Sequence, residues 1–325
     1  MSDVSVSIFV PTWNGGDEFR TNLGLLLAQK LDRPFEIVVI DSGSTDGTRE
    51  FLETQPVRLV TIANREFNHG LTRNRGIELC KGDIVALTVQ DARPESTDWL
   101  QRLVDCFDDP RVVGAFGRQV ARADANPFIR HRLSGWVAAG TEPRIQEISN
   151  PEEFWKLAPL ERLQRIAFDN VNSAVRRSTM QEIPFRERKF GEDIDWSMRA
   201  ILAGHRIVFE PRSAVVHSHD NSAWYEFKRT YADHSNLHET LGVHTIKSKK
   251  ALLRCIRYQA RVYREVIDKD ERIAGFWRKL SWRFRSWTFS IAENSGQYFG
   301  AKSARKLREG SRFYRRLDRL LRRGV

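Results

Sequence analysis

Short apolar runs alternate with amphipathic stretches along the first third of the chain. Residues with high strand propensity fill ranges 5–11, 35–41, 57–63 and 83–89, and helical periodicity separates them at 17–30, 48–54 and 70–80. Strands that alternate with helices in this way predict parallel pairing through right-handed crossovers. The last of these strands has no charge in its interior, which is typical of a strand buried on both faces.

The pattern changes further along the chain. A helix at 98–107 and a strand at 112–116 continue the alternation, whereas range 121–167 holds Pro127, Pro143, Pro151 and Pro159. Prolines at this density predict loops and short helices. Another helix up to residue 203 and a strand at 206–216 follow. Beyond about residue 236 the pattern is helical and almost free of strand signals.

Charge divides the chain in a similar place. The 325 residues carry a formal charge of +11, with 41% apolar side chains, enough to bury a substantial core. Residues 247–325 hold 23 Lys and Arg against 7 Asp and Glu, or +16, so residues 1–246 carry 11 − 16 = −5. Together with the strand and helix pattern, this predicts an α/β domain at 1–235 and a basic α-helical region at 236–325.

Compartment signals favour the cytosol. The apolar runs are far shorter than the roughly 20 residues that cross a bilayer, and the chain shows no signal-peptide pattern. Cys80, Cys106 and Cys255 are widely spaced, as expected for reduced thiols without a metal role. We expect a cytoplasmic protein.

Polar residues follow the first two predicted strands. In open α/β sheets the ligand crevice lies at the carboxyl ends of the strands, where loops offer backbone N–H groups and short polar side chains. The candidates for nucleotide binding there are Pro11, Thr12, Asn14, Asp41, Ser44 and Asp46. In the alternative interpretation, Asp46 and Gly47 form only a turn and Asp41 caps the next helix.

Two further clusters fit a diphosphate. His69, Arg73 and Asn74 stand at the start of a helix, where backbone amides and an arginine suit a pyrophosphate, although a solvated helix start with an Asn cap explains the same residues. Gln90 and Asp91 come directly after the buried strand at 84–89. A carboxylate at that position is suited to hold a divalent cation against a diphosphate.

The later part of the chain adds acids and histidines. Glu192, Asp193 and Asp195 begin a helix, where acids favour the helix dipole but also offer a general base. His217 and His219 follow the strand at 206–216 and could complete a metal site.

These motifs together resemble family 2 glycosyltransferases with the GT-A fold. The resemblance rests on order and spacing, and it covers residues 5 to about 235. It is carried by Pro11-Thr12-Trp13-Asn14, Asp41-Ser42-Gly43-Ser44-Thr45-Asp46-Gly47, Arg73-Asn74-Arg75-Gly76, Gly191-Glu192-Asp193 and His217-Ser218-His219. Within that family, His69-Gly70, Gln90-Asp91-Ala92 and Gly117-Arg118-Gln119 look like bacterial rhamnosyltransferases that use dTDP-L-rhamnose.

The resemblance implies an α/β fold, a Rossmann-like nucleotide-binding mixed sheet flanked by helices, with a basic helical C-terminal extension. It implies that Asp41 contacts the base and that Arg73 and Asn74 lie near ribose and phosphate. Asp91 matches the second acid of the family's D-x-D metal motif, whereas Val89 stands at the first acid's position. Asp91 and one of the two histidines would then hold Mn²⁺ or Mg²⁺.

The implied activity is that of an inverting, metal-dependent hexosyltransferase. Asp193 matches the family's catalytic base, with Glu192 and Asp195 as its competitors. The expected donor is a nucleotide sugar, with dTDP-L-rhamnose as the best guess and UDP-hexose or another nucleoside-diphosphate sugar as the alternative. The acceptor would be a bacterial surface glycan or a lipid-linked glycan.

The basic region leaves two interpretations open. It could lie against the anionic inner face of the plasma membrane, where each Lys or Arg near the surface contributes about 1 kcal/mol. Alternatively, its Trp residues pack on the catalytic domain and its cations are simply solvated. A nucleic-acid-binding protein would also be basic, but it leaves the acids at 192–195 and the two histidines unexplained, so no nucleic-acid partner is expected. A non-catalytic nucleotide-binding module would leave Asp91 and Asp193 without a purpose.

Overall fold

The computed structural model describes residues 5–188 and 190–324, which divide into two compact units. The first unit comprises the chain up to residue 122 with ranges 133–157 and 163–217, and the second comprises 123–132, 158–162 and the chain from 218 onward. Residues 1 and 325, the outer limits of the two predicted domains, lie outside the described residues. The predicted boundary at residue 235 falls within helix α10 (Ala223–Leu241) and stays a prediction.

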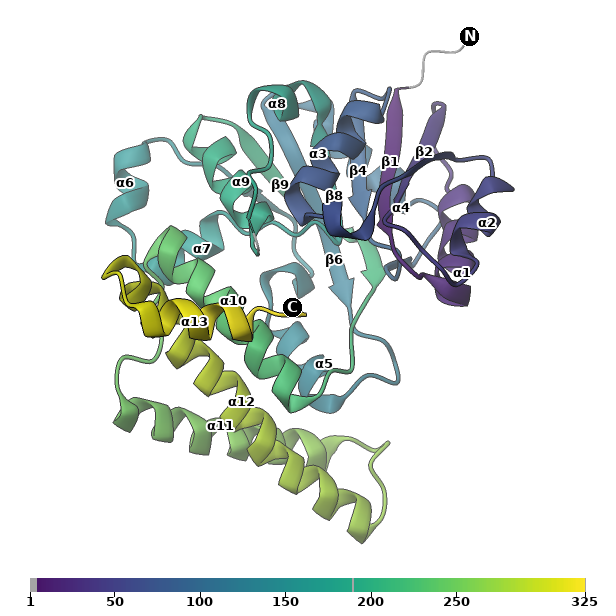
Figure 1. The fold of residues 1–325 in the computed structure, drawn as a ribbon. Coiled ribbons are helices and arrows are strands. Elements are labelled where there is room, and N and C mark those ends of the chain that lie inside the picture. Colours follow the sequence, from purple (N-terminus) through teal and green to yellow (C-terminus); the bar gives the residue numbers. More distant parts are fainter. Residues whose placement is uncertain (1–4, 189, 325) are drawn as a thin grey trace. The chain divides into compact units, whose positions relative to one another are not determined.

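The first half of the sheet is parallel, as the alternating pattern predicted. Its strand order is β3 (Arg58–Thr61), β2 (Phe35–Asp41), β1 (Val6–Thr12) and β4 (Ile84–Thr88). Helices α1 (Gly16–Leu27), α2 (Thr48–Glu53) and α3 (His69–Leu79) connect these strands. Because β1, β2 and β4 run in the same direction, their carboxyl ends meet at one edge of the sheet (Figure 1).

The second half makes the sheet mixed. Strand β8 (Asn172–Arg176) runs antiparallel to both β4 and β6 (Val112–Val120), and β6 pairs in parallel with β9 (Arg206–Val216). The short strands β5 (Arg93–Pro94) and β7 (Arg144–Gln146) pair with β9. This mixed sheet flanked by helices confirms the predicted fold class.

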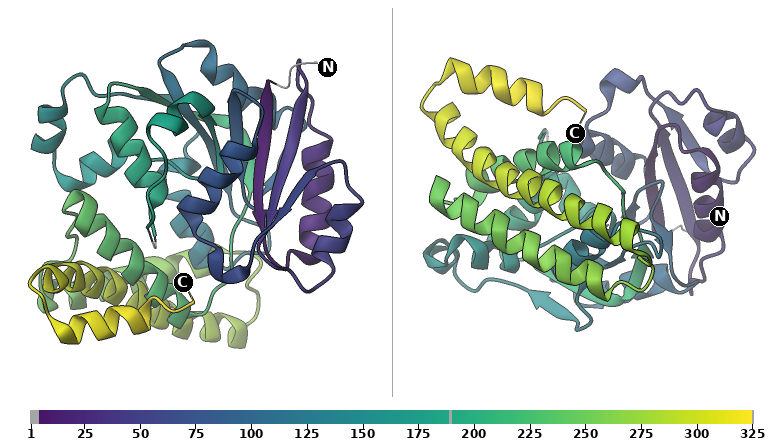
Figure 2. Two further views of the ribbon diagram at one scale, coloured as in Figure 1. Left: turned by 45° about the horizontal axis from the view of Figure 1, so that its top comes forward. Right: turned by 90° about the horizontal axis from the view of Figure 1, so that it is seen from below.

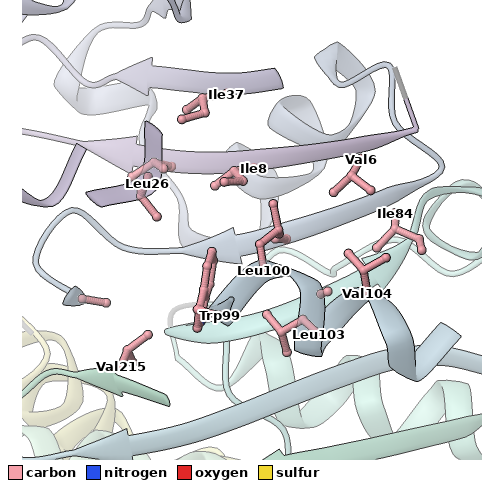
Figure 3. Packing of buried hydrophobic residues seen from close by; sticks show 14 of the residues in the cluster. Val6, Ile8, Leu26, Ile37, Ile84, Trp99, Leu100, Leu103, Val104 and Val215 are labelled. Carbon is pink, nitrogen blue, oxygen red and sulfur yellow. The ribbon is translucent and has the colours of Figure 1, made fainter. Parts of the chain in front are cut away.

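The core of the first unit lies on both faces of β1. Val6, Ile8 and Val10 point to one face, where they pack with α1 and with Trp99 of helix α4 (Trp99–Val104) (Figure 3). Phe9 points to the other face, toward α3. There Gly76 allows close approach, because a Cβ at that position would lie only 2.1 Å from the Phe9 ring.

Prolines start the helices of the region whose organisation the sequence left open. Helices α5 (Pro127–Ser134), α6 (Pro151–Lys156) and α7 (Pro159–Arg165) each begin with proline, a residue that needs no hydrogen-bond acceptor in the first turn. The remaining helices of the first unit are α8 (Arg177–Glu182) and α9 (Glu192–Leu202), and short 3₁₀ turns lie at 64–66, 105–108 and 137–139.

The second unit is helical, and it includes the region beyond residue 236 that the sequence predicted to be helical. With α10 and most of α5 it contains α11 (Lys249–Lys269), α12 (Phe276–Arg308) and α13 (Arg312–Leu321), and α11 lies alongside α12 (Figure 2). A small core joins these helices through Phe128, Tyr263, Ile267, Ile273 and Phe289. No helix in the described chain combines the length and the apolar character needed to cross a bilayer.

Beside this core, Arg132 on α5 forms ion pairs with two buried carboxylates. It contacts Glu226 of α10 and lies 3.1 Å from Glu293 of α12. The hydroxyl of Tyr263 on α11 donates to the other oxygen of Glu293. One guanidinium group therefore neutralises acids from two helices, and the network includes side chains from four.

Candidate donor and catalytic site

The loops after β1 and β4 are joined by Gln90. Its Oε1 accepts from the Thr12 hydroxyl at 2.7 Å and from the Trp13 backbone N–H at 2.8 Å, and its amide donates to the Trp13 carbonyl at 3.3 Å. A second polar residue, Asn22 on α1, donates to the Gln90 backbone carbonyl. The side chains of Thr12 and Gln90 thus fix the edge of the sheet where a nucleotide is predicted to bind.

Asp41 organises the loop after β2. It is fully buried, and its carboxylate accepts from the backbone N–H groups of Gly43 and Ser44, each at 3.1 Å, and from the Ser44 hydroxyl. Gly43 has φ +80°, a conformation that favours glycine. Asp41 therefore sets the shape of this loop, and its predicted contact with the base remains a prediction.

Asn14 and Asp46 hold the loops after β1 and β2 together. The Asn14 side chain accepts from the Thr45 N–H at 2.8 Å, and the Asn14 N–H donates to Ser44 Oγ at 2.8 Å. Asp46 accepts from Gly16 and Thr48, and the hydrogen bonds with Thr48 lower the pKa of its carboxyl. Asn14 has φ +48°, an uncommon value for a residue other than glycine. The predicted donor residues of these loops are therefore neighbours.

The start of α3 is a capped helix with a buried arginine. Asn68 caps the helix, since its side chain accepts from Gly70 and Leu71, but the buried Arg73 does not fit a solvated helix start. Arg73 is buried and pairs with Glu192 at 3.0 Å, and both polar atoms of the Asn74 side chain bond to the backbone of Phe185. His69 is exposed at the first residue of the helix. Contacts of these three residues with donor phosphate remain predictions.

A carboxylate and an imidazole face each other at the exits of β4 and β9. Asp91 Oδ1 lies 3.6 Å from His217 Nε2, and both side chains are partly buried. Ligand atoms bound at about 2.0–2.2 Å to one cation lie about 3.0–3.5 Å apart at ordinary coordination angles, so the pair nearly has the required spacing. Pro11 precedes Thr12 at the same edge, and His219 lies two residues beyond His217, at the start of the second unit.

A hydrogen-bonded chain continues behind His217. Its Nδ1 lies 3.3 Å from Gln119 Oε1 on β6, and the Gln119 amide donates to Asp169 just before β8. A proton on Nδ1 directs the Nε2 lone pair toward Asp91, which is the tautomer that a cation requires. Gln119 therefore orients the His217 ring, and the role of His217 as a metal ligand remains a prediction.

The three acids at the start of α9 have different partners. Glu192 pairs with Arg73 and accepts from Asn170, whereas Asp195 is buried and pairs with Arg188 and Arg199, each at 2.9 Å. In the described parts of the chain, no basic side chain within 4 Å pairs with Asp193, whose Oδ1 accepts from the N–H of Ile194.

The electrostatics of Asp193 suit a proton acceptor. Desolvation raises the pKa of this carboxyl well above its ordinary value, and the charges of Glu192 and Asp169 raise it further. A carboxylate with a raised pKa is, once ionised, a stronger base than an ordinary carboxylate, which suits it to accept a proton. The structure thus distinguishes Asp193 from two acids that are neutralised by arginines.

The sequence did not predict the part that Gln119 and Asp169 play in the hydrogen-bonded chain behind His217. Gln119 stood in a recognised motif without an assigned role, and Asp169 lies at the end of the proline-rich region and was not considered. The signal for Asp169 was its position directly before a short strand, but β8 itself was not predicted. The hydrogen bonds that link these two residues to His217 form only because β6 pairs with both β8 and β9 in the folded sheet.

Comparisons with known proteins identify similarity to glycosyltransferases. A family model described as glycosyl transferase family 2 matches residues 7–176. The O-antigen chain rhamnosyltransferase WbaN of Salmonella anatum is 30% identical over 230 residues, which is 70% of this chain and 70% of the relative. The O-antigen chain rhamnosyltransferase RfbN of Salmonella typhimurium is 29% identical over 234 residues, which is 70% of this chain and 71% of the relative.

A solved structure agrees in fold. The S. aureus protein TarS has 18% sequence identity and a TM-score of 0.50, and the match covers 92% of this chain and 55% of that one.

Proposed function

Since the chain belongs to glycosyl transferase family 2 and has a GT-A fold, we propose that it is an inverting rhamnosyltransferase that uses dTDP-L-rhamnose. The observation that carries the choice of sugar is the similarity to two proteins named O-antigen chain rhamnosyltransferases over 70% of the chain. A bacterial surface glycan, free or lipid-linked, is the proposed acceptor. A UDP-hexose or another nucleotide sugar is the alternative donor within the same family.

The proposed reaction is a single displacement. Asp193 accepts the proton of an acceptor hydroxyl, whose oxygen forms a bond to the anomeric carbon of the donor. The bond from that carbon to the diphosphate oxygen breaks, and the nucleoside diphosphate leaves with its electron pair. Attack from the face opposite the leaving group inverts the anomeric centre. The raised pKa of Asp193 supports this role, and Glu192 and Asp195, which pair with arginines, are the competing bases.

A divalent cation, Mn²⁺ or Mg²⁺, is the proposed cofactor. Asp91 and His217 fit one, because a carboxylate oxygen and an imidazole nitrogen face each other at a suitable spacing. His219 is the third proposed ligand, since two peptide units keep its Cα within about 7 Å of the His217 Cα. When bound, the cation would neutralise charge on the diphosphate.

The remaining residues around this edge are proposed to position the donor. Thr12, Asn14, Ser44 and Asp46 shape the two loops that would face the nucleotide, and Gln90 holds one of them. Hydrogen bonds of this kind keep a binding loop in one conformation before the ligand arrives, which lowers the entropic cost of binding. Further proposed donor contacts come from Pro11, Asp41, His69, Arg73 and Asn74.

We also propose that the protein works in the cytoplasm, at the inner face of the plasma membrane. The +16 charge of residues 247–325 supports attraction to anionic lipid. This attraction would bring the enzyme close to lipid-linked acceptors.

A panel of nucleotide sugars tests the proposed donor. With Mn²⁺ present, release of nucleoside diphosphate is measured for dTDP-L-rhamnose, UDP-glucose, UDP-N-acetylglucosamine and GDP-mannose. The proposal predicts the highest kcat/KM with dTDP-L-rhamnose. Preference for a UDP-hexose would establish the alternative donor, and absence of turnover with the whole panel, with and without a lipid extract as acceptor, would contradict the proposal.

A further inference from the structure

The first half of α12 exposes large apolar side chains along one face. Phe276, Leu280, Phe284, Trp287 and Ile291 are 72, 48, 71, 39 and 49% exposed. Their spacings of four, four, three and four residues place them within an arc of about 80° on an ideal helix. We call these five residues the α12 stripe, and it extends over about 22 Å of helix.

The opposite face of α12 is already packed. Phe289 belongs to the core of the second unit, and the ring of Trp282 contacts Phe128 edge-on at 5.6 Å between centroids. Further along the helix, Glu293 is bound in the Arg132 network. These contacts fix the rotation of α12 about its axis. The fold of this unit therefore keeps the stripe exposed, and a small rotation of α12 cannot bury it without breaking these contacts.

Basic side chains border the stripe. The guanidinium of Arg264 on α11 lies 5.9 Å from the centre of the Trp287 ring, and Arg283 of α12 pairs with Asp268 at 2.9 Å. Leu280, Phe284 and Trp287 line an open cavity of about 710 Å³ together with three arginines and two acids: Arg261, Arg264, Arg283, Glu265 and Asp268. Apolar surface with aromatic rings and flanking arginines is the composition of helices that lie in the membrane interface.

We infer that the α12 stripe inserts into the interfacial layer of a lipid bilayer. The helix would lie parallel to the membrane plane, with the stripe among the upper acyl chains and the long arginine side chains extending to the headgroups. The positive charge of residues 247–325 favours an anionic lipid surface over a second copy of the chain as the partner of the stripe. Two copies would bring together surfaces from regions of +16 each, whereas an anionic bilayer converts the same charge into attraction.

This inference rests on the membrane contact proposed above and adds insertion of apolar side chains to it. The two contributions can be measured separately. Attraction by charge alone disappears at high salt and on neutral lipid, whereas insertion of apolar side chains does not depend on either condition. Sugar transfer to a soluble acceptor depends on neither form of membrane contact.

The test is binding to neutral phosphatidylcholine vesicles in 0.5 M salt, measured by flotation with the full chain. We expect the unmodified protein to bind and the double variant Leu280→Glu/Phe284→Glu to lose at least about tenfold in partition coefficient. The control is Ile145→Glu/Leu160→Glu, which changes the charge equally at side chains that are 58 and 53% exposed on other elements. This control should bind as the unmodified protein does.

A second measurement guards against misfolding of the variant. Lipids brominated in the upper acyl chain should quench tryptophan fluorescence of the unmodified protein, and Trp287→Phe should reduce that quenching. Absence of binding to neutral vesicles, equal binding of both double variants, or absence of quenching would overturn the inference. It would also be overturned if the protein were a stable dimer without lipid affinity and Leu280→Glu/Phe284→Glu made it monomeric.

Discussion

At the scale of single residues, Asp193 differs from its neighbours on α9 in what surrounds its carboxylate. We expect Asp193→Asn to lose about 10²- to 10⁴-fold in transfer rate while donor affinity is kept, because an amide cannot accept the proton. Transfer rates and donor dissociation constants should be measured for this variant and for Asp195→Asn. Asp195 is paired with Arg188 and Arg199, so its variant should lose stability and keep more activity. Normal turnover by Asp193→Asn would return the role of base to Glu192.

The same carboxyl predicts a pH dependence of stability. Burial raises the pKa of Asp193 in the folded protein, so the folded state binds this proton more tightly than the unfolded chain does. The resulting stability is complete below the unfolded value of about 3.9 and is lost as pH rises from there through the raised folded pKa. Asp193→Asn should therefore unfold at a higher temperature than the unmodified protein at pH 7.5, and the difference should shrink toward pH 4. A difference independent of pH would contradict this explanation.

Asp91 and His217 predict metal-dependent binding of nucleoside diphosphate. Calorimetry with dTDP should show tighter binding with Mn²⁺ than with a chelator, because a bare carboxylate repels the diphosphate. Asp91→Asn and His217→Gln should each weaken binding in Mn²⁺ by at least about 10- to 100-fold. Asp83→Asn is the control, since that side chain is 85% exposed and lies at the opposite end of β4. Equal affinity with Mn²⁺ and with chelator would remove the cation from the proposal.

At the scale of elements, hydrophobic periodicity predicted the strands whose buried side chains are mostly apolar. The predicted ranges 35–41 and 206–216 coincide with β2 and β9. Strand β8 was missed because its sequence is short and polar. Asn172 is fully buried there and accepts from the Trp99 indole at 2.8 Å while its amide donates to the Ser213 carbonyl at 2.9 Å. Such a residue is acceptable in a strand only through partners that are distant in sequence.

The residues of the candidate site could be predicted from the sequence only in part. Residues at strand ends could be found from the sequence, because parallel strands bring their carboxyl ends to one edge. The contacts that hold the site together could not, since Arg73 and Glu192 are 119 positions apart and Gln119 and Asp169 are 50 apart. In the described part of the chain, Glu192 and Asp195 pair with arginines and Asp193 does not, and only the folded structure shows this difference.

The helices of the second unit make a separate prediction about Arg132. Arg132→Met leaves two buried carboxylates, Glu226 and Glu293, without a counter-charge, so we expect a loss of about 3 kcal/mol in unfolding free energy. The loss should be smaller at low pH, where the carboxyls of the variant are protonated. Arg130→Met on the same helix is the control, because its ion pair with Asp270 is long at 3.8 Å and its side chain is 44% exposed. Urea unfolding at two pH values measures both.

At the scale of the whole molecule, charge and chemistry lie in different stretches of the chain. Residues 1–246 carry −5 and include every proposed donor, metal and catalytic residue, whereas residues 247–325 carry +16. Binding to vesicles with anionic lipid should therefore weaken as salt rises from 0.05 to 0.5 M, toward the level seen with neutral vesicles. Cosedimentation across this range measures it. Binding that is equal on anionic and neutral vesicles at low salt would exclude the electrostatic contribution.

The α12 stripe also bears on how the enzyme finds its acceptor. A protein that stays on a surface encounters lipid-linked molecules by lateral diffusion in two dimensions, and it can remain there between turnovers. Its turnover then depends on the number of acceptors per unit area of membrane, while the soluble donor arrives from the bulk. Diluting the acceptor with inert lipid at constant total acceptor would slow such an enzyme, although every bulk concentration of substrate stays the same.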